Sequence, residues 1–258
     1  MTKREYAQAI AKEIGNAEVK EVEKANGVIK TGIMCSAPNG VNPVIYIDGM
    51  YKDGKSVEEA TREVKSIMEN AMGMEININA LENYDTAKGI LEARLYNKST
   101  KADVKRSAKK YGYDDLIIVP YLNLGEGKAS KVTKNMLDVW GVTATRVINQ
   151  ALRNMKGKCK IAELSEIIPT PMEAPFKVVI TESKMFGAIA AIIMEKELSE
   201  MYPCGYTVIP SSIHEMLVLP VGDVSMKDLA NMIVEVNKTF LMPEEILSDK
   251  AYDIVAVA

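Results

Sequence analysis

The sequence predicts an α+β fold, with mixed, largely antiparallel sheets and packed helices in two or three small modules. Short β-prone runs, some of them separated by turn dipeptides such as Asn26-Gly27, alternate with helical patterns. No strand run is followed by the G-x-G-x-x-G turn of a dinucleotide-binding domain. This mixture favours antiparallel sheets covered by helices over a doubly wound parallel sheet. A chain of 258 residues, 47% of them apolar, is long enough for more than one core.

The first module is expected over residues 1–80, in the order α-β-β-β-α. Tyr6, Ile10 and Ile14 recur at helical spacing and predict a helix over 5–14. This helix should bury its apolar stripe against the strands that follow it.

The strands of this module are predicted by turn chemistry and by β-branched residues. Asn26-Gly27 lies between two β-prone runs and predicts a hairpin within 19–29, and residues 44–47 predict a third strand. Ser56, with Glu59 three residues later, forms a capping-box pattern that begins the closing helix.

The middle region, residues 81–166, is expected to be basic and mostly helical, with one hairpin. Helical spacing and a turn at Gly125-Glu126-Gly127 support this prediction. The turn is followed by Lys128, but its spacing does not fit a phosphate-binding loop. The expected elements are helices over 84–97, 100–110, 136–140 and 143–155, and a hairpin formed by 115–124 and 128–133.

Three prolines within residues 167–175 predict a linker, because proline lacks a backbone donor and resists helix formation. A C-terminal module with the order β-α-β-β-α-β is expected over residues 172–258. Its expected strands lie at 177–180, 206–209, 216–219 and 252–257, and its helices at 187–202 and 226–236.

A cytoplasmic location without membrane contact is expected. The longest apolar run, residues 186–194, is far below the ~20 residues that span a bilayer, and the charged N-terminus has no secretory apolar region. Cys35, Cys159 and Cys204 are widely spaced and form no C-x-x-C pair, which argues against disulfides and zinc ribbons. No cofactor and no metal are expected.

Charge is unevenly distributed along the chain. The net charge is −3, yet residues 94–160 hold 15 basic and 5 acidic residues. Such a region is a candidate site for anions or nucleic acid, whose affinity would depend strongly on salt; the alternative is a solvated face. The candidate residues are Lys98, Lys101, Lys105, Arg106, Lys109, Lys110, Lys128, Lys131 and Lys134.

The segment Pro210-Ser-Ser-Ile-His-Glu215 contains the single histidine of the chain. A zinc H-E-x-x-H motif is absent, because position 218 is Val. In a strand, Ser212 and His214 would share a face about 6–7 Å apart, too far for direct proton transfer. We therefore expect a turn held by serine hydroxyls, with a ligand pocket as the alternative. The candidate ligand-binding residues are Ser211, Ser212, His214 and Glu215, and no catalytic residue is assigned.

This Pro-Ser-Ser-Ile-His-Glu motif, followed by an apolar strand ending at Pro220, resembles the hallmark of an uncharacterised family of Clostridia and related gut Firmicutes, often encoded near mobile elements. The resemblance spans about residues 41–252 and implies kinship and fold, with no assigned reaction and no catalytic residues. This chain departs from the family at Thr181-Glu182-Ser183, where a Thr-Asn pair is more frequent. The other segments that carry the resemblance are Pro43–Ile47, Met136–Val142 with Trp140-Gly141-Val142, Phe186-Gly187-Ala188, Val234–Asn237, Leu247-Ser248-Asp249 and Tyr252.

The leading hypothesis is a non-catalytic cytosolic binding protein that acts on a macromolecular partner. The family resemblance adds the setting of a mobile element or of host conflict. One alternative is an enzyme or small-ligand protein with its pocket at the Pro210–Glu215 motif. The other is nucleic-acid binding through the basic middle region.

Overall fold

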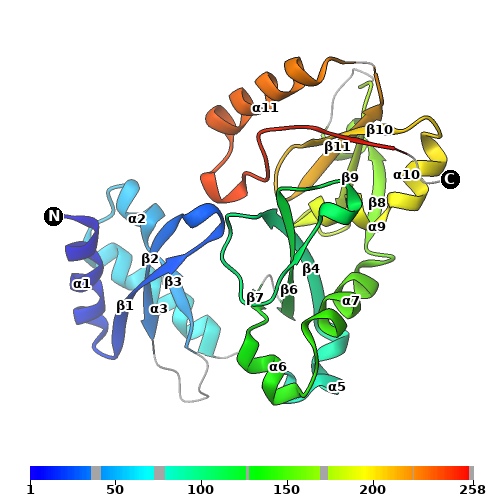
Figure 1. Ribbon diagram of the computed structural model, residues 1–258. Helices are drawn as coiled ribbons and strands as arrows, with labels where there is room; N and C mark the ends of the chain where they lie inside the picture. The colour runs from blue at the N-terminus through cyan, green and yellow to red at the C-terminus, as the bar shows by residue number, and fades with distance from the viewer. Residues whose placement is uncertain (36–41, 73–78, 126–127, 169–173, 223, 256–258) are drawn as a thin grey trace. The chain divides into compact units, whose positions relative to one another are not determined.

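The computed structural model describes residues 1–35, 42–72, 79–125, 128–168, 174–222 and 224–255. The chain divides into two compact units, an N-terminal unit (Met1–Asn77) and a C-terminal unit (Ile78–Ala258). Every strand pairing in the described residues is antiparallel, and helices pack on the sheets, so the predicted α+β class is confirmed (Figure 1).

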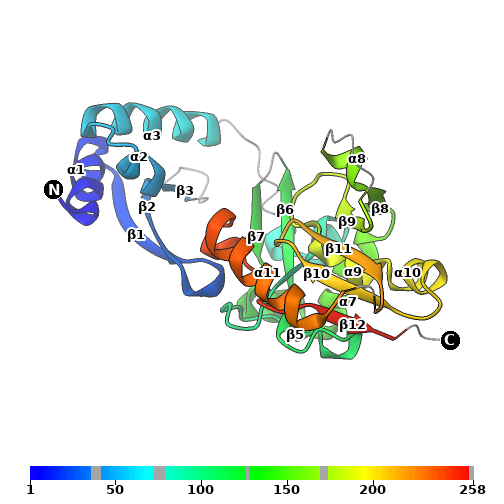
Figure 2. The ribbon, with the colours of Figure 1, turned by 90° about the horizontal axis from the view of Figure 1, so that it is seen from above.

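The described part of the N-terminal unit has the predicted order α-β-β-β-α, with a 3₁₀ turn and a short helix in addition. Its strands form a meander in the order β1-β2-β3, and α1 and α3 lie side by side (Figure 2). Asn26 and Gly27 have positive φ, +58° and +74°, as the predicted hairpin turn requires. The elements are α1 (Lys3–Ile14), β1 (Ala17–Glu23), η1 (Ala25–Gly27), β2 (Ile29–Cys35), β3 (Val44–Tyr46), α2 (Asp48–Lys52) and α3 (Val57–Met72).

The core of this unit follows the predicted apolar stripes. Tyr6 and Ile10 of α1 are buried with Ile33 of β2 and Val64 of α3. The predicted capping box of α3 is formed, because the Glu59 amide donates to Ser56 Oγ and the Ser56 amide donates to Glu59 Oε2.

The C-terminal unit contains two sheets. One sheet has the order β4-β6-β5, with β7 also paired to β6, and the other has the order β12-β10-β11-β9-β8. The strands are β4 (Leu91–Asn97), β5 (Arg106–Ser107), β6 (Leu116–Gly125), β7 (Lys128–Lys131), β8 (Cys159–Glu163), β9 (Lys177–Thr181), β10 (Tyr206–Pro210), β11 (Glu215–Pro220) and β12 (Tyr252–Ile254).

The helices of this unit cover the two sheets, with α7 on β4 and β6 and α11 on β10 (Figure 1). The predicted helices over 136–140, 143–155 and 226–236 are confirmed, as is the hairpin of β6 and β7. The described helices are α4 (Asn79–Glu82), α5 (Tyr84–Ala87), η2 (Lys88–Ile90), η3 (Lys109–Tyr111), α6 (Lys134–Trp140), α7 (Ala144–Met155), α8 (Leu164–Ile167), η4 (Gly187–Ile189), α9 (Ala190–Ile193), α10 (Glu195–Met201), α11 (Met226–Phe240) and η5 (Pro243–Glu245).

The prediction of a mostly helical middle region is wrong. Residues 91–97 form β4, and the segment 100–110 is an irregular connection with a two-residue strand and a short 3₁₀ turn. Leu91 and Leu95 lie four residues apart, a spacing that occurs in helices and also on one face of a strand. Residues 91–97 form a strand because they pair with β6.

The C-terminal strands and helices follow the predicted order β-α-β-β-α-β. The strands on either side of the proline segment, β8 and β9, pair with each other, so the regions before and after it share one sheet. Residues 169–173 of that segment, residues 126–127 of the Gly125–Lys128 turn and residues 256–257 of the expected last strand lie outside the described residues.

The single helix predicted over 187–202 is divided into η4, α9 and α10. Its apolar part, η4 and α9, is buried between the two sheets. It contacts β4 on one side and β9 and β11 on the other. Its position brings the loop before it, residues 182–186, against the hairpin of β10 and β11.

Candidate functional site

The Pro210–Glu215 motif forms the turn between β10 and β11. The Ser212 amide donates to the Glu215 carbonyl (3.2 Å), and Ser212 Oγ accepts from the His214 amide (2.9 Å). The hydroxyls of Ser211 and Ser212 both donate to Glu215 Oε1, each at 2.9 Å. Both hydroxyl protons therefore point to one carboxylate of the same turn, as expected for serines that stabilise local backbone.

His214 connects this turn to two other segments. Its Nδ1 accepts a hydrogen bond from the Phe186 amide (3.2 Å), and its Nε2 lies 3.6 Å from Glu245 Oε1. Because Nδ1 accepts, the neutral ring carries its proton on Nε2, facing Glu245. Both ring nitrogens thus face protein groups, and the ring packs at 5.5 Å from the ring of Phe186.

Gly187 allows the backbone around His214 to pack closely. A Cβ atom at this position would overlap the His214 carbonyl oxygen and would lie 2.6 Å from the Thr181 amide nitrogen. The Ala188 amide donates to the Ile213 carbonyl (3.3 Å). The Phe186-Gly187-Ala188 segment and the Pro210–Glu215 motif are therefore in close contact, although they are distant in sequence. We call this contact the joint.

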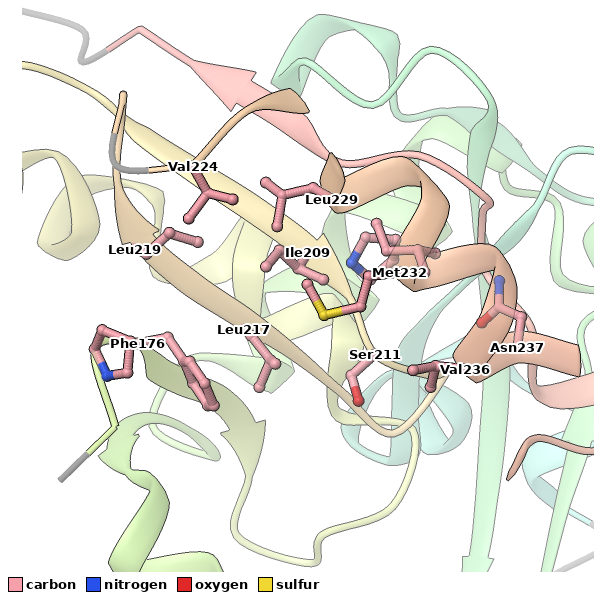
Figure 3. A pocket seen from close by; sticks show the side chains of 13 residues that line it. Phe176, Ile209, Ser211, Leu217, Leu219, Val224, Leu229, Met232, Val236 and Asn237 are labelled. Atoms are coloured by element: carbon pink, nitrogen blue, oxygen red, sulfur yellow. The ribbon is translucent and has the colours of Figure 1, made fainter. Parts of the chain in front are cut away.

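A groove lies between α11 and the hairpin of β10 and β11, with a volume of about 270 Å³. Figure 3 shows the side chains of Ile209, Leu229 and Met232 pointing toward one another across it. Of the four predicted ligand-binding residues, only Ser211 lines it. Its lining is almost wholly apolar and consists of Pro175, Phe176, Ile209, Pro210, Ser211, Leu217, Leu219, Val224, Leu229, Met232, Ile233, Val236 and Asn237.

A second pocket, of about 440 Å³, lies on the other side of the joint and has a polar lining. We call it the Arg94 pocket, after the buried arginine of β4 that it contains. None of the four predicted ligand-binding residues lines it, whereas Lys128 from the predicted basic set does. Its lining consists of Glu92, Ala93, Arg94, Asn123, Gly125, Lys128, Met155, Lys158, Thr181, Glu182, Ser183, Met185 and Phe186.

A polar cluster fixes the C-terminal tail to Asp115, the residue before β6. Asp115 accepts hydrogen bonds from Tyr252 Oη (2.6 Å) and Ser248 Oγ (2.8 Å). Asn237 Nδ2 donates to the Ser248 carbonyl (3.0 Å) and to Asp249 Oδ1 (2.8 Å). The tail segments that carry the family resemblance therefore meet in this cluster.

The comparisons with known proteins identify one family, DUF5688, a family of unknown function, which matches residues 3–253. The chain belongs to this family. The match covers strands and helices of both units. No curated protein and no solved structure matches the chain.

The predicted basic residues of this DUF5688 member lie on several elements. Arg106 is on β5, where its Nη1 donates to Asn149 Oδ1 (2.7 Å), Lys128 and Lys131 are on β7, and Lys134 begins α6. They do not form one helix face, because the segment 100–110 is not helical. Nucleic-acid binding through them stays a prediction. Five are exposed on the connection between β4 and β6, namely Lys98, Lys101, Lys105, Lys109 and Lys110.

Two features of the candidate site were missed from the sequence. Arg94 was counted among the basic residues but not singled out, although it follows Glu92 at a spacing of two in a run with Leu91, Ala93 and Leu95. That alternation is the signal of a strand with one polar side. The groove had no such signal, because its apolar residues come from separate segments.

The thiols of Cys35 and Cys159 are not activated as nucleophiles in this arrangement. Burial, with a smaller contribution from the carboxylate of Glu182, raises the pKa of Cys159 to about 12, and burial also raises the pKa of Cys35. A reactive cysteine needs a lowered pKa. Within the described ranges, no group of His, Cys, Asp and Glu side chains could hold a metal ion, and no helix is long and apolar enough to cross a membrane.

Alkaline pH is expected to destabilise the C-terminal unit. Burial, followed by the carboxylate of Glu195, raises the pKa of Tyr206 to about 12 from about 10. The contribution of Tyr206 to the free energy of unfolding is fully present below pH 10. It is lost as the pH rises toward 12, because over this range Tyr206 ionises only in the unfolded chain. The slope for one such group is at most about 1.4 kcal/mol per pH unit.

Urea unfolding at a series of pH values from 8 to about 11.5, which covers most of the interval between the two pKa values, checks this expectation. The Tyr206→Phe variant should lose stability less steeply than the wild type above pH 10. Equal slopes for both proteins would contradict it.

Proposed function

We propose that this protein is a non-catalytic binding protein and that its macromolecular partner is another protein, which docks an apolar segment in the groove between α11 and the β10–β11 hairpin. The observation that carries the proposal is the exposed apolar rim of this groove. Met232 is 50% exposed and Val236 is 36% exposed, although both line the groove.

The helix α11 presents two neighbouring apolar stripes. Leu229 and Ile233 are buried against the sheet, whereas Met232, Val236 and Phe240 recur at a spacing of four and are exposed. A helix that needed only to cover its sheet would carry polar residues at the second stripe. Contiguous exposed apolar surface of this kind marks an interaction site, and methionine adapts its shape to different partners.

The geometry of the Pro210–Glu215 motif supports a role without catalysis. A serine nucleophile needs a base within hydrogen-bond reach of its hydroxyl proton. Here both serine hydroxyls donate to Glu215, and the His214 ring is engaged by the Phe186 amide and faces Glu245. The motif then serves the function indirectly, by fixing the hairpin that forms one wall of the groove.

The proposal also includes the setting of the protein. Its three cysteines are unpaired, which supports a cytoplasmic location. An accessory role on mobile elements or in host conflict rests on the family resemblance of the Pro210–Glu215 motif alone.

A charged substitution at the groove rim is expected to weaken the binding of the partner. Met232→Glu places a charge that would have to be desolvated on docking, so retention of the partner should fall at least about tenfold. The measurement is quantitative co-purification from cells that express the tagged protein. Met201→Glu, on α10 and 45% exposed, is the matched control, because Met201 does not line the groove.

The result that supports the proposal is a protein retained by the wild type and by Met201→Glu and lost with Met232→Glu. Identical retention by all three proteins would count against it. A turnover that disappears in His214→Asn, a substitution that keeps an acceptor near the position of Nδ1, would refute the non-catalytic reading.

A further inference from the structure

Arg94 of β4 carries a buried guanidinium. It is 9% exposed, and its Nε is buried with no hydrogen-bond partner. Glu92, two residues earlier on the same face of β4, is engaged elsewhere, because its Oε1 accepts from Asn123 Nδ2 (2.8 Å) and lies 3.3 Å from Lys158 Nζ. In the described parts of the chain, no carboxylate pairs with the Arg94 guanidinium.

Two aromatic rings hold the guanidinium of Arg94. Its Cζ lies 3.7 Å from the ring centroid of Phe186 and 4.2 Å from that of Tyr121. Stacked rings satisfy the flat faces of a guanidinium and offer nothing to the N–H groups at its edge. Those donors need acceptors in the guanidinium plane, the geometry in which a carboxylate or a phosphate binds through two oxygens.

The space beside this cation suits a ligand. The Arg94 pocket has a volume of about 440 Å³, within the range of small-molecule sites. Lys128 and Lys158 line it with Arg94, and Thr181 and Ser183 contribute hydroxyls to its wall. Glu182 also lines it, so the pocket is not simply a basic surface.

We propose that the Arg94 pocket binds the oxyanion group, carboxylate or phosphate, of a small-molecule ligand, with the stacked Arg94 guanidinium as its main contact. This site is separate from the apolar groove and goes beyond the proposed docking function. A buried unpaired charge is costly, and replacing it by an apolar side chain of similar size is often neutral or stabilising. A buried arginine to which the described residues offer no counter-ion therefore indicates a ligand rather than a contribution to stability.

Thermal unfolding of the full chain tests the proposal. The wild type is compared in sodium phosphate, in sodium succinate and in sodium chloride of equal ionic strength. With an anion concentration of about 20 mM and a dissociation constant near 1 mM, a rise in Tm of about 4 °C over chloride is expected. A rise with phosphate alone assigns a phosphorylated ligand, a rise with succinate alone assigns a carboxylate, and a rise with both fits either source.

The Arg94→Met variant shows whether Arg94 binds a ligand or only stabilises the fold. This variant is expected to lose the anion-dependent rise while its Tm in chloride stays equal to that of the wild type or increases. The Lys158→Met variant gives a second test, which does not depend on the folding of Arg94→Met. Its control is Lys156→Met, a neighbouring lysine outside the pocket lining. Lys158→Met should at least halve the rise, and Lys156→Met should leave it unchanged.

The proposal is overturned if neither anion exceeds chloride in the wild type. It is also overturned if Arg94→Met keeps the full rise, or if Lys158→Met and Lys156→Met behave alike.

Discussion

Replacing Gly187 by alanine is expected to destabilise the C-terminal unit by about 3 kcal/mol or more, which is in the upper range for a single substitution. The added Cβ would meet two backbone atoms, the carbonyl oxygen of His214 and the amide nitrogen of Thr181. Neither can move as a flexible side chain would, because Thr181 ends β9 and His214 leads directly into β11. Relief of the overlap therefore requires the two segments to separate.

Separation of these segments would also break the joint around His214. The hydrogen bonds from the Phe186 amide to His214 Nδ1 and from the Ala188 amide to the Ile213 carbonyl both cross this contact. Urea unfolding of Gly187→Ala measures the loss as a lower midpoint.

Gly89→Ala is the matched control for this prediction. Gly89 is in the same unit, its φ is not in the left-handed region, and an added Cβ would meet no atom within 4 Å. Alanine there should change stability by less than about 1 kcal/mol, with a gain expected from the lower entropy of the unfolded chain. If the two variants unfold at the same urea concentration, the close contact at Gly187 does not limit stability.

The sequence predicted those elements whose signals are local. Asn26-Gly27 fixed the first hairpin and Ser56 with Glu59 fixed the start of α3, because turn and capping chemistry involves residues close together in the chain. Residues 84–90 are helical as predicted, but residues 91–97 and the segment 100–110 were mistaken for helices. The strands β4 and β5 form by pairing with β6, where Leu91 faces Leu122 and Asn97 faces Leu116, far from each other along the chain. Such non-local pairing is not encoded in a local period.

The candidate site was predictable in part. The Pro210–Glu215 turn and its serine hydrogen bonds follow from the preference of serine for bonding nearby backbone. The partner of His214 did not follow, because it is the backbone amide of Phe186, and any residue could supply an amide there. The charge of Arg94 can be read from the sequence. Its burial cannot, because it depends on aromatic rings from β6 and from the loop before η4.

Replacing Asp115 by alanine is expected to cost about 3 kcal/mol, because it leaves two donors without an acceptor, each worth about 1–3 kcal/mol when buried. Those donors are the hydroxyls of Tyr252 and Ser248, which are 5% and 2% exposed. Asp114 provides an adjacent control. It forms an ion pair with Lys250 at 2.6 Å in which both side chains are about half exposed.

Asp114→Ala should cost no more than about 1 kcal/mol, since exposed ion pairs contribute little. Urea unfolding of the two variants measures the difference between their losses of stability. Added salt shows whether each loss comes from an exposed ion pair or from buried hydrogen bonds. Salt should weaken the Asp114–Lys250 contribution and leave the Asp115 contribution nearly unchanged, because the hydroxyl donors of the latter are neutral and buried. Equal losses for the two variants would mean that the Asp115 cluster does not fix the tail, and that the pairing of β12 with β10 and the apolar packing of α11 hold it instead.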